Sequence, residues 1–304
     1  MTKVEQLLCE LIALPSVNPA FLPLDDPRAG EKRVGEFVAV EAAKAGLDIE
    51  VQEVIAGRSN VLARLAPSGK VKNRVLLAPH LDTVVAEDGQ FSPRLKNGRL
   101  YGRGACDTKG SVAAMLSALC DVARGRQRPR ETEIVFAGLV DEENAQAGSR
   151  ALAASGMKAE LAIVGEATRL QVATAHKGIL WLSLTTEGKA AHGSKPELGR
   201  NAVHEMARVV EVLETEYAKE LGRRRHSLLG HATVNVGTIA GGRQPNIVPE
   251  RCRIVIDRRT LPGESERGVV EEISRLLRRK GLKVKFAREN QAACLPMETD
   301  ARLP

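Results

Sequence analysis

The amino-acid stretch with the greatest bearing on the fold is Arg74-Val75-Leu76-Leu77-Ala78-Pro79-His80-Leu81-Asp82-Thr83-Val84. Its apolar run is typical of a buried strand, and a histidine and an aspartate follow where that strand is predicted to end. Similar apolar runs alternate with helical patterns on both sides of it. This strand–helix–strand alternation predicts an α/β domain with a mixed, mostly parallel sheet.

The helices and strands of this first domain are predicted from residue spacing and from stop signals. Leu7, Leu8 and Leu11 recur at helical intervals before Pro15, and Gly46 closes a second amphipathic helix. Helices are expected over 4–12, 31–45, 109–122 and 147–155, and strands over 48–54, 60–65, 74–81, 134–140 and 161–164.

The pattern of predicted helices and strands changes after about Lys177. The expected elements are a strand over 179–186, a helix over 201–217, strands over 232–239 and 251–257, a helix over 264–277 and a strand over 282–286. The order β-α-β-β-α-β is that of the ferredoxin-like α+β fold. We therefore predict two domains: residues 1–177 together with 289–304 form the first, and residues 178–288 form an inserted second domain.

Composition narrows the classes of function. The chain has 304 residues, of which 43% are hydrophobic and 27% charged, and its formal net charge is +7. Aromatic residues make up only 3%, which speaks against a surface that stacks nucleic-acid bases. No apolar run reaches the length of about 18 residues that a membrane span needs. The five cysteines form no CxxC pair and no signal peptide is recognised, so a cytoplasmic location is predicted.

Carboxylates and a histidine gather at the predicted strand ends and in the loops beyond them. They are His80, Asp82, Asp107, Glu142, Glu143 and Glu166. The carboxyl ends of the strands carry the functional site in α/β sheets, so these side chains are expected to converge. Zinc prefers imidazole and carboxylate ligands, and a two-metal site needs a bridging carboxylate.

The spacing within this set indicates a division of roles. Asp82 lies two residues after His80 on a strand, so it points to the same side and can orient the imidazole. Glu142 and Glu143 are adjacent in the sequence. One of them can therefore bind a metal while the other stays free to take a proton from water.

Four stretches, in this order, resemble signature motifs of the M20 metallopeptidases, the group that contains acetylornithine deacetylase and succinyl-diaminopimelate desuccinylase. They are residues 78–84 (APHLDTV), 101–110 (YGRGACDTKG), 141–143 (DEE) and 164–168 (VGEAT). The resemblance covers essentially the whole chain. It implies a catalytic domain of zinc-peptidase type that holds two divalent metal ions, Zn²⁺ or Co²⁺.

The resemblance also implies a role for each residue of the set. His80 and Glu166 would hold one metal, Asp107 would bridge, Glu143 would bind the second metal, Glu142 would be the general base and Asp82 would orient His80. Family members often have a cis peptide bond after the bridging aspartate, which here is the bond between Asp107 and Thr108.

The second domain carries its own match. Residues 188–194 (GKAAHGS), followed by Asn201-Ala202, are similar to the opening of the M20 lid and dimerisation domain. In that family, the histidine at the position of His192 helps to polarise the scissile carbonyl, often across a dimer interface. The resemblance further implies that Asn246 and Arg258 bind the substrate carboxylate, and that the chain forms a homodimer through this domain.

The match to the family fails after the lid. M20 enzymes return there to the catalytic domain, and a late histidine ligates the second metal, whereas no histidine follows His231 in this chain. The expectation is therefore a C-terminally truncated enzyme with an incomplete catalytic sheet. Its metal site beside Glu143 would be the weaker one.

The expected function is hydrolysis of the amide bond of an N-acyl amino acid, of the acetylornithine or succinyl-diaminopimelate type, or of a small peptide. Metal-activated water would attack, with Glu142 as general base. The absent ligand leaves an alternative, a catalytically impaired or non-catalytic dimer that binds metal or an amino acid. Neither nucleic acid nor a membrane is expected as a partner, and the absence of a GxSxG motif disfavours a serine hydrolase.

Overall fold

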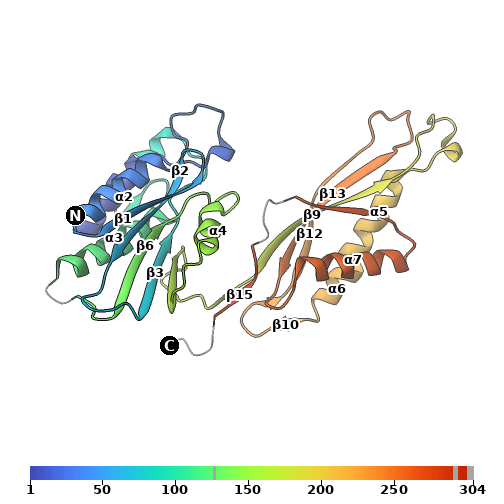
Figure 1. The fold of residues 1–304 in the computed structure, drawn as a ribbon. Coiled ribbons are helices and arrows are strands. Elements are labelled where there is room, and N and C mark those ends of the chain that lie inside the picture. The colour runs from blue at the N-terminus through green and yellow to red at the C-terminus, as the bar shows by residue number, and fades with distance from the viewer. Residues whose placement is uncertain (126–127, 290–293, 300–304) are drawn as a thin grey trace. The chain divides into compact units, whose positions relative to one another are not determined.

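The computed structural model describes residues 1–125, 128–289 and 294–299. The chain divides into two compact units, Met1–Gln171 and Val172–Pro304. Figure 1 shows both, coloured along the chain.

The first unit is built on a five-stranded sheet with the order β1-β2-β6-β3-β7. The strands are β1 (Asp48–Ile55), β2 (Arg58–Leu65), β6 (Thr132–Gly138), β3 (Asn73–Pro79) and β7 (Leu161–Gly165). β3 is parallel to both β6 and β7, whereas β2 is antiparallel to its two neighbours. Four of the five strands therefore run in one direction, which confirms the predicted mixed sheet.

Helices cover both faces of this sheet (Figure 1). α1 (Lys3–Ala13), α2 (Lys32–Lys44) and α3 (Lys109–Arg124) pack on one face, where residues such as Leu11, Val38 and Leu116 bury against Ala63 and Phe136. α4 (Ala147–Ala154) packs on the other face, where Leu152 belongs to a cluster with Leu62, Ala78 and Val135. Alternate residues of β2 thus enter opposite cores, as strand geometry requires.

The carboxyl ends of three parallel strands meet at one edge of this sheet. β3 ends at Pro79, which lies opposite Gly165 at the end of β7. Beyond β3, an isolated bridge joins His80 to Leu139 of the segment that follows β6. The segments that begin at residues 80, 139 and 166 are therefore neighbours, and α3 begins nearby at Lys109, just after Asp107.

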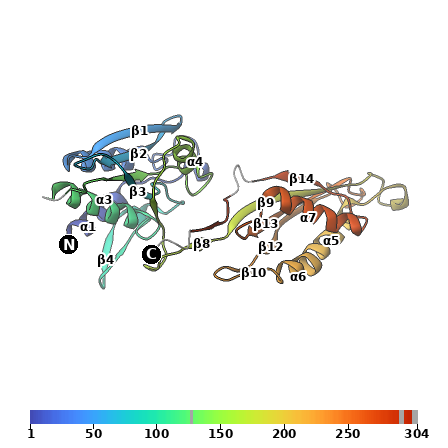
Figure 2. The ribbon, with the colours of Figure 1, turned by 60° about the horizontal axis from the view of Figure 1, so that its bottom comes forward.

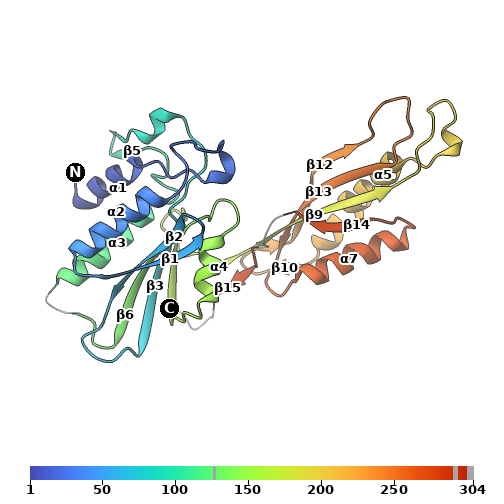
Figure 3. The ribbon, with the colours of Figure 1, turned by 45° about the horizontal axis from the view of Figure 1, so that its top comes forward.

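The second unit has the predicted ferredoxin-like topology. Its four-stranded antiparallel sheet has the order β12-β13-β9-β14, which Figure 3 shows. The strands are β9 (Gly178–Glu187), β12 (Thr233–Gly241), β13 (Arg251–Thr260) and β14 (Lys285–Arg288). α5 (Ala202–Val212) and α7 (Glu266–Arg279) lie on the same face, where Met206 and Ile273 pack with Leu182 of β9 in one core.

One helix of this unit differs from its prediction. The helix expected over 201–217 consists of α5, a π-helical segment Leu213–Tyr217 (η4) and a last turn α6 (Ala218–Leu221). Tyr217 is fully buried at the end of the π-helical segment. The helical path thus continues four residues beyond the predicted end.

Short elements complete the two units. They are η1 (Pro19–Phe21), η2 (Asp88–Phe91), the hairpin β4 (Arg94–Lys96) and β5 (Arg99–Tyr101), β8 (Ala175–His176) paired with β15 (Met297–Glu298), η3 (Pro196–Leu198), and β10 (Arg225–His226) paired with β11 (Gly230–His231). The β4–β5 hairpin projects away from the first sheet (Figure 2). Within the described ranges, no helix has both the length and the apolar character that crossing a membrane requires.

The pairing of β15 with β8 bears on the predicted domain boundaries. Both strands belong to the second unit, which begins at Val172. The assignment of residues 289–304 to the first domain stays a prediction, and residues 290–293 and 300–304 lie outside the described ranges.

Candidate metal centre

Three of the predicted metal ligands converge in the first unit. Ligand atoms of His80, Asp107 and Glu143 all lie within 4.8 Å of one another. His80 follows β3, Glu143 follows β6, and Asp107 ends the turn before α3. Three segments separated in the sequence therefore meet at the sheet edge where the strand directions led us to expect a site.

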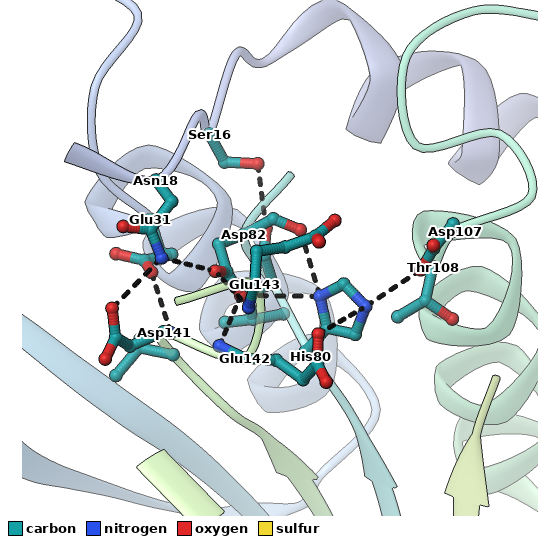
Figure 4. Close-up of polar contacts among 12 residues, drawn as sticks. Ser16, Asn18, Glu31, His80, Asp82, Asp107, Thr108, Asp141, Glu142 and Glu143 are labelled. Atoms are coloured by element: carbon teal, nitrogen blue, oxygen red, sulfur yellow. Dashed lines mark hydrogen bonds and ion pairs between the residues drawn. The ribbon is translucent and has the colours of Figure 1, made fainter. Parts of the chain in front are cut away.

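The His80 imidazole is held between two carboxylates (Figure 4). Its Nδ1 lies 3.3 Å from Oδ1 of Asp82 and 3.0 Å from the Asp82 carbonyl oxygen, while its Nε2 lies 3.0 Å from Oδ1 of Asp107. A proton on Nδ1 that is shared with Asp82 leaves Nε2 as the nitrogen that faces Asp107. The ring is thus oriented as a metal-ligating histidine usually is.

The site has a buried floor and an open front. His80 and Asp82 are almost completely buried, whereas the side chains of Asp107 and Glu142 are 58% and 39% exposed. Oε2 of Glu142 lies 3.9 Å from Nε2 of His80. The groups that would meet a ligand and a substrate therefore face solvent, and the groups that orient them do not.

Asp82 organises the turn that carries the two glutamates. Its Oδ1 accepts a hydrogen bond from the backbone N–H of Glu142 at 3.0 Å, and its Oδ2 accepts one from that of Glu143 at 3.1 Å. Burial by itself would raise the pKa of Asp82, but hydrogen bonds from His80 and Asn18 outweigh it and hold that pKa below its usual range. Asp82 is therefore an anion at neutral pH.

The remaining acids repel one another. Burial, reinforced by the charge of Asp107, raises the pKa of Glu143 to about 7. Burial also raises the pKa of Glu142 and that of Glu166, with neighbouring carboxylates adding to the effect. Burial would lower the pKa of His80, but Asp82 and the other acids raise it to about 10.

This donor set suits a divalent cation. One imidazole nitrogen and several carboxylate oxygens are the ligands that zinc and similar ions take, and a cation removes the repulsion among these acids. The residues that fit are His80, Asp107, Glu143 and, from its place in the same electrostatic cluster, Glu166. His80 is the only histidine in residues 1–171.

The turn before α3 is fixed to the neighbouring strand end. The peptide bond between Asp107 and Thr108 is cis, as the resemblance led us to expect. Oγ1 of Thr108 donates a hydrogen bond to the carbonyl of Gly165 at 2.7 Å. This bond joins the segment of Asp107 to the residue that precedes Glu166.

Sequence reasoning missed a buried polar network behind the site. It consists of Asn18, Glu31, Arg58 and Asp141. Asn18 contacts Asp82 and Asp141, and Arg58 contacts Asp141 and Glu31. The available signal was weak, because the segment around Pro15 and Pro19 indicates only that α1 ends there.

In the second unit the structure brings two predicted residues into neighbouring loops. An isolated bridge joins His192 to Ile247, and the N–H of Gly193 donates to the carbonyl of Asn246 at 2.7 Å. Both His192 and Asn246 are exposed, and Nδ1 of His192 lies 2.7 Å from Oγ of Ser194.

Arg258 has a different environment from the one predicted. Its side chain is fully buried, with Nη2 2.6 Å from Oε1 of Glu264 and Nε 3.1 Å from the hydroxyl of Tyr217, while Nη1 donates to the carbonyl of Arg259. Every guanidinium nitrogen is engaged inside the second unit. We therefore correct the prediction that Arg258 binds a substrate carboxylate, because in this structure it holds the fold together.

The chain is similar to several characterised families and proteins. Residues 60–166 match peptidase family M28, and residues 174–285 match the peptidase dimerisation domain of M20 enzymes. Acetylornithine deacetylase of Proteus mirabilis (strain HI4320) is 32% identical over 268 residues, covering 85% of this chain and 67% of the relative.

Two solved structures illustrate the shared fold. A tripeptidase from Staphylococcus aureus subsp. aureus Mu50 has a TM-score of 0.77 at 21% identity, covering 99% of this chain and 78% of that one. A dinuclear metal-binding peptidase of the M20 family from Bacillus subtilis has a TM-score of 0.68 at 13% identity, covering 98% of this chain and 75% of that one.

An α/β unit with converging imidazole and carboxylate groups, joined to a peptidase dimerisation domain, defines a metal-dependent hydrolase. The chain belongs to the M20 peptidase family.

Proposed function

We propose that the chain hydrolyses the amide bond of an N-acyl amino acid or of a small peptide at the site formed around His80. The observation that supports this most directly is the convergence of His80, Asp107 and Glu143, with Asp82 behind them and Glu142 at the open front. His80 and Glu166 would hold one metal, Glu143 the other, and Asp107 would bridge them.

Glu142 is the proposed general base. A divalent ion at this site, when bound, polarises a carbonyl and makes a water more acidic. The Glu142 carboxylate takes the proton from the attacking water and delivers it to the leaving amine. Burial raises the pKa of Glu142 above its usual range, which makes its carboxylate a better proton acceptor.

The second unit supplies the proposed contacts to the substrate. The neighbouring loops carry an imidazole at His192 and an amide at Asn246, both exposed. A hydrogen-bond donor aimed at the developing oxyanion is a general need of amide hydrolysis, and His192 would serve it. Asn246 would bind the substrate carboxylate.

The substrate, the metal ion and the oligomeric state are also part of this proposal. The relative from Proteus mirabilis is an acetylornithine deacetylase, which supports an N-acetyl or N-succinyl amino acid as substrate. Zn²⁺ and Co²⁺ both suit the donor set. The match to a peptidase dimerisation domain supports a homodimer through the second unit. The cytoplasmic location stays a prediction from sequence.

A binding protein without turnover is the alternative. It is favoured by one observation: the first unit holds a single imidazole, that of His80, and in the described part of the chain the ligand atoms that lie within 4.8 Å of one another are those of His80, Asp107 and Glu143. It predicts metal and amino-acid binding without release of product.

The test begins with metal-stripped protein. Zinc is titrated to count tight sites per chain, and the loaded protein is then incubated with N-acetylornithine, N-succinyl-diaminopimelate and a dipeptide while amine release is measured. Two tight sites and amine release that depends on Glu142 support the hydrolase. Normal metal binding with no amine release from any of these compounds favours the binding protein.

A further inference from the structure

The Asp82 carboxylate is the junction of the candidate site. It contacts the His80 ring and accepts hydrogen bonds from the backbone N–H groups of Glu142 and Glu143. The orientation of this carboxylate therefore affects the position of two proposed metal ligands, His80 and Glu143, and of the proposed base, Glu142. A carboxylate on a strand end can rotate about its own side chain. Its orientation therefore depends on every group that bonds its two oxygens.

Asn18 is one of these groups, and it also ties Asp82 to a second carboxylate. Its Nδ2 donates to Oδ2 of Asp82 at 2.7 Å and to Oδ1 of Asp141 at 3.0 Å, and both hydrogen bonds are buried. Its Oδ1 accepts from the N–H of Ala20 at 3.1 Å, which fixes which end of the amide faces the two acids. Figure 4 shows Asn18 between Asp82 and Asp141.

At the other end of this bridge, Asp141 forms an ion pair with Arg58. Arg58 donates from Nη1 to Oδ1 of Asp141 at 3.0 Å and makes two bonds to Glu31, from Nε at 2.8 Å and from Nη2 at 2.5 Å. Oε1 of Glu31 also accepts the backbone N–H of Asp141 at 3.1 Å. Asp141 has a positive φ of 66°, so this turn depends on contacts that hold it.

We infer that Asn18 is a positioning residue for the metal centre: by bridging Asp82 to the braced Asp141 it fixes the orientation of Asp82, and through it His80 and the Glu142–Glu143 turn. A neutral amide suits this place, because a donor is needed between two carboxylates and a third anion would repel both. The inference rests on the proposed function only in assuming that a metal binds.

The test compares Asn18→Ala with a matched control, Asn60→Ala. Asn60 is equally buried in the same unit, and its side chain bonds Gln52 and the backbone of Gly148 and Val140 rather than a carboxylate. The free energy of unfolding is measured by urea titration of metal-free protein. Co²⁺ affinity and the visible spectrum of the Co²⁺-loaded protein report the ligand geometry.

Both variants are expected to lose stability, but only Asn18→Ala should lose Co²⁺ affinity, by about 10–100-fold, and change the Co²⁺ spectrum. An exchange variant, N18D/D141N, keeps the net charge and allows a bond between positions 18 and 141, but places an anion against Asp82. The single variant Asn18→Asp serves as its reference. The exchange variant should be more stable than Asn18→Asp, but its Co²⁺ affinity should remain as low.

The inference is overturned if Asn18→Ala binds Co²⁺ as the wild type does, or if the exchange variant restores affinity together with stability. The test does not depend on turnover. If the wild-type chain binds Co²⁺ but releases no amine, the proposed hydrolase activity is contradicted, and the Co²⁺ affinities of the variants still decide this inference. A wild-type chain that binds no Co²⁺ overturns both.

Discussion

The guanidinium of Arg258 and the carboxylate of Glu264 form an ion pair within the second unit, with 2.6 Å between Nη2 and Oε1. Arg258 is fully buried, and the ring of Tyr217 lies 5.8 Å from its Cζ. Removing one partner of such a pair leaves a charge with poor solvation, which costs more than the pair itself contributes.

We expect Arg258→Met to lower the free energy of unfolding by about 3–5 kcal/mol. The matched control is Arg259→Met on the opposite face of β13, whose pair with Asp257 is partly exposed and should contribute less than about 1 kcal/mol. Urea unfolding measures both variants. A stable Arg258→Met protein with a raised KM would restore the substrate-binding role that we have corrected.

Glu142→Gln tests the general base. The substitution keeps the shape of the side chain and removes its capacity to accept a proton, so kcat should fall by at least about 100-fold. Zinc stoichiometry should be unchanged, because Glu142 is not among the converging ligands. The control is Glu36→Gln, an exposed position on α2. Turnover of Glu142→Gln near the wild-type value would exclude this residue as the base.

Much of the fold was predictable because its signals are local. β1 was expected over 48–54 and spans Asp48–Ile55. The ferredoxin-like order follows from helices and strands that were each predicted from their own local sequence. The convergence of His80 and Glu143 was also predictable, because parallel strands place their carboxyl ends at one edge, and the family resemblance added Asp107 from the turn before α3.

For Arg258, the sequence contained a signal of burial, but the motif match was given more weight. Cys252, Ile254, Ile256 and Arg258 alternate along β13, so Arg258 lies on the face that is buried against the helices. The motif around Asp257 favoured a binding role instead. Strand alternation was the better guide at this position.

Asn18 shows the opposite case, in which the sequence signal is weak and indicates only that a helix ends nearby. Its two acceptors, Asp82 and Asp141, lie 64 and 123 residues away along the chain. Helical or strand periodicity reports only on neighbours within a few residues. A bridge of this kind emerges from tertiary packing, and only the structure could reveal it.

Metal binding should depend on pH in a defined direction. In the metal-free protein the pKa of His80 is raised to about 10 and that of Glu143 to about 7. A metal takes the neutral imidazole and the ionised carboxylate, so binding must displace the protons that these groups hold. Zinc affinity should therefore rise with pH through this range.

Calorimetry in two buffers of different ionisation enthalpy counts the protons released on zinc binding. We expect about two protons to be released per chain that binds both metals near pH 6, where His80 and Glu143 are both protonated, and about one near pH 8.5, where only His80 is. A His80→Ala variant should release about one fewer at either pH. Equal proton release at both pH values would contradict the raised pKa of Glu143.

Lys109 provides a test of how α1 and α3 are joined. Its ammonium group is fully buried and donates to the carbonyls of Leu11 and Leu14, at 2.9 and 2.6 Å, at the C-terminal end of α1. Burial lowers the pKa of Lys109 to about 7. The unfolded chain, with an ordinary lysine pKa of about 10.4, therefore binds more protons than the folded chain between these values.

Stability that arises from Lys109 should thus rise with pH above about 7, by up to about 1.4 kcal/mol per pH unit. Lys109→Met abolishes this titration and leaves two helix-end carbonyls without a donor, so its deficit relative to the wild type should be larger at pH 9 than at pH 7. Urea unfolding of metal-free protein at both pH values measures it, with the exposed Lys3→Met as control. A deficit that is the same at both pH values would mean that the ammonium of Lys109 stays charged, held by the partial negative charge at the end of α1.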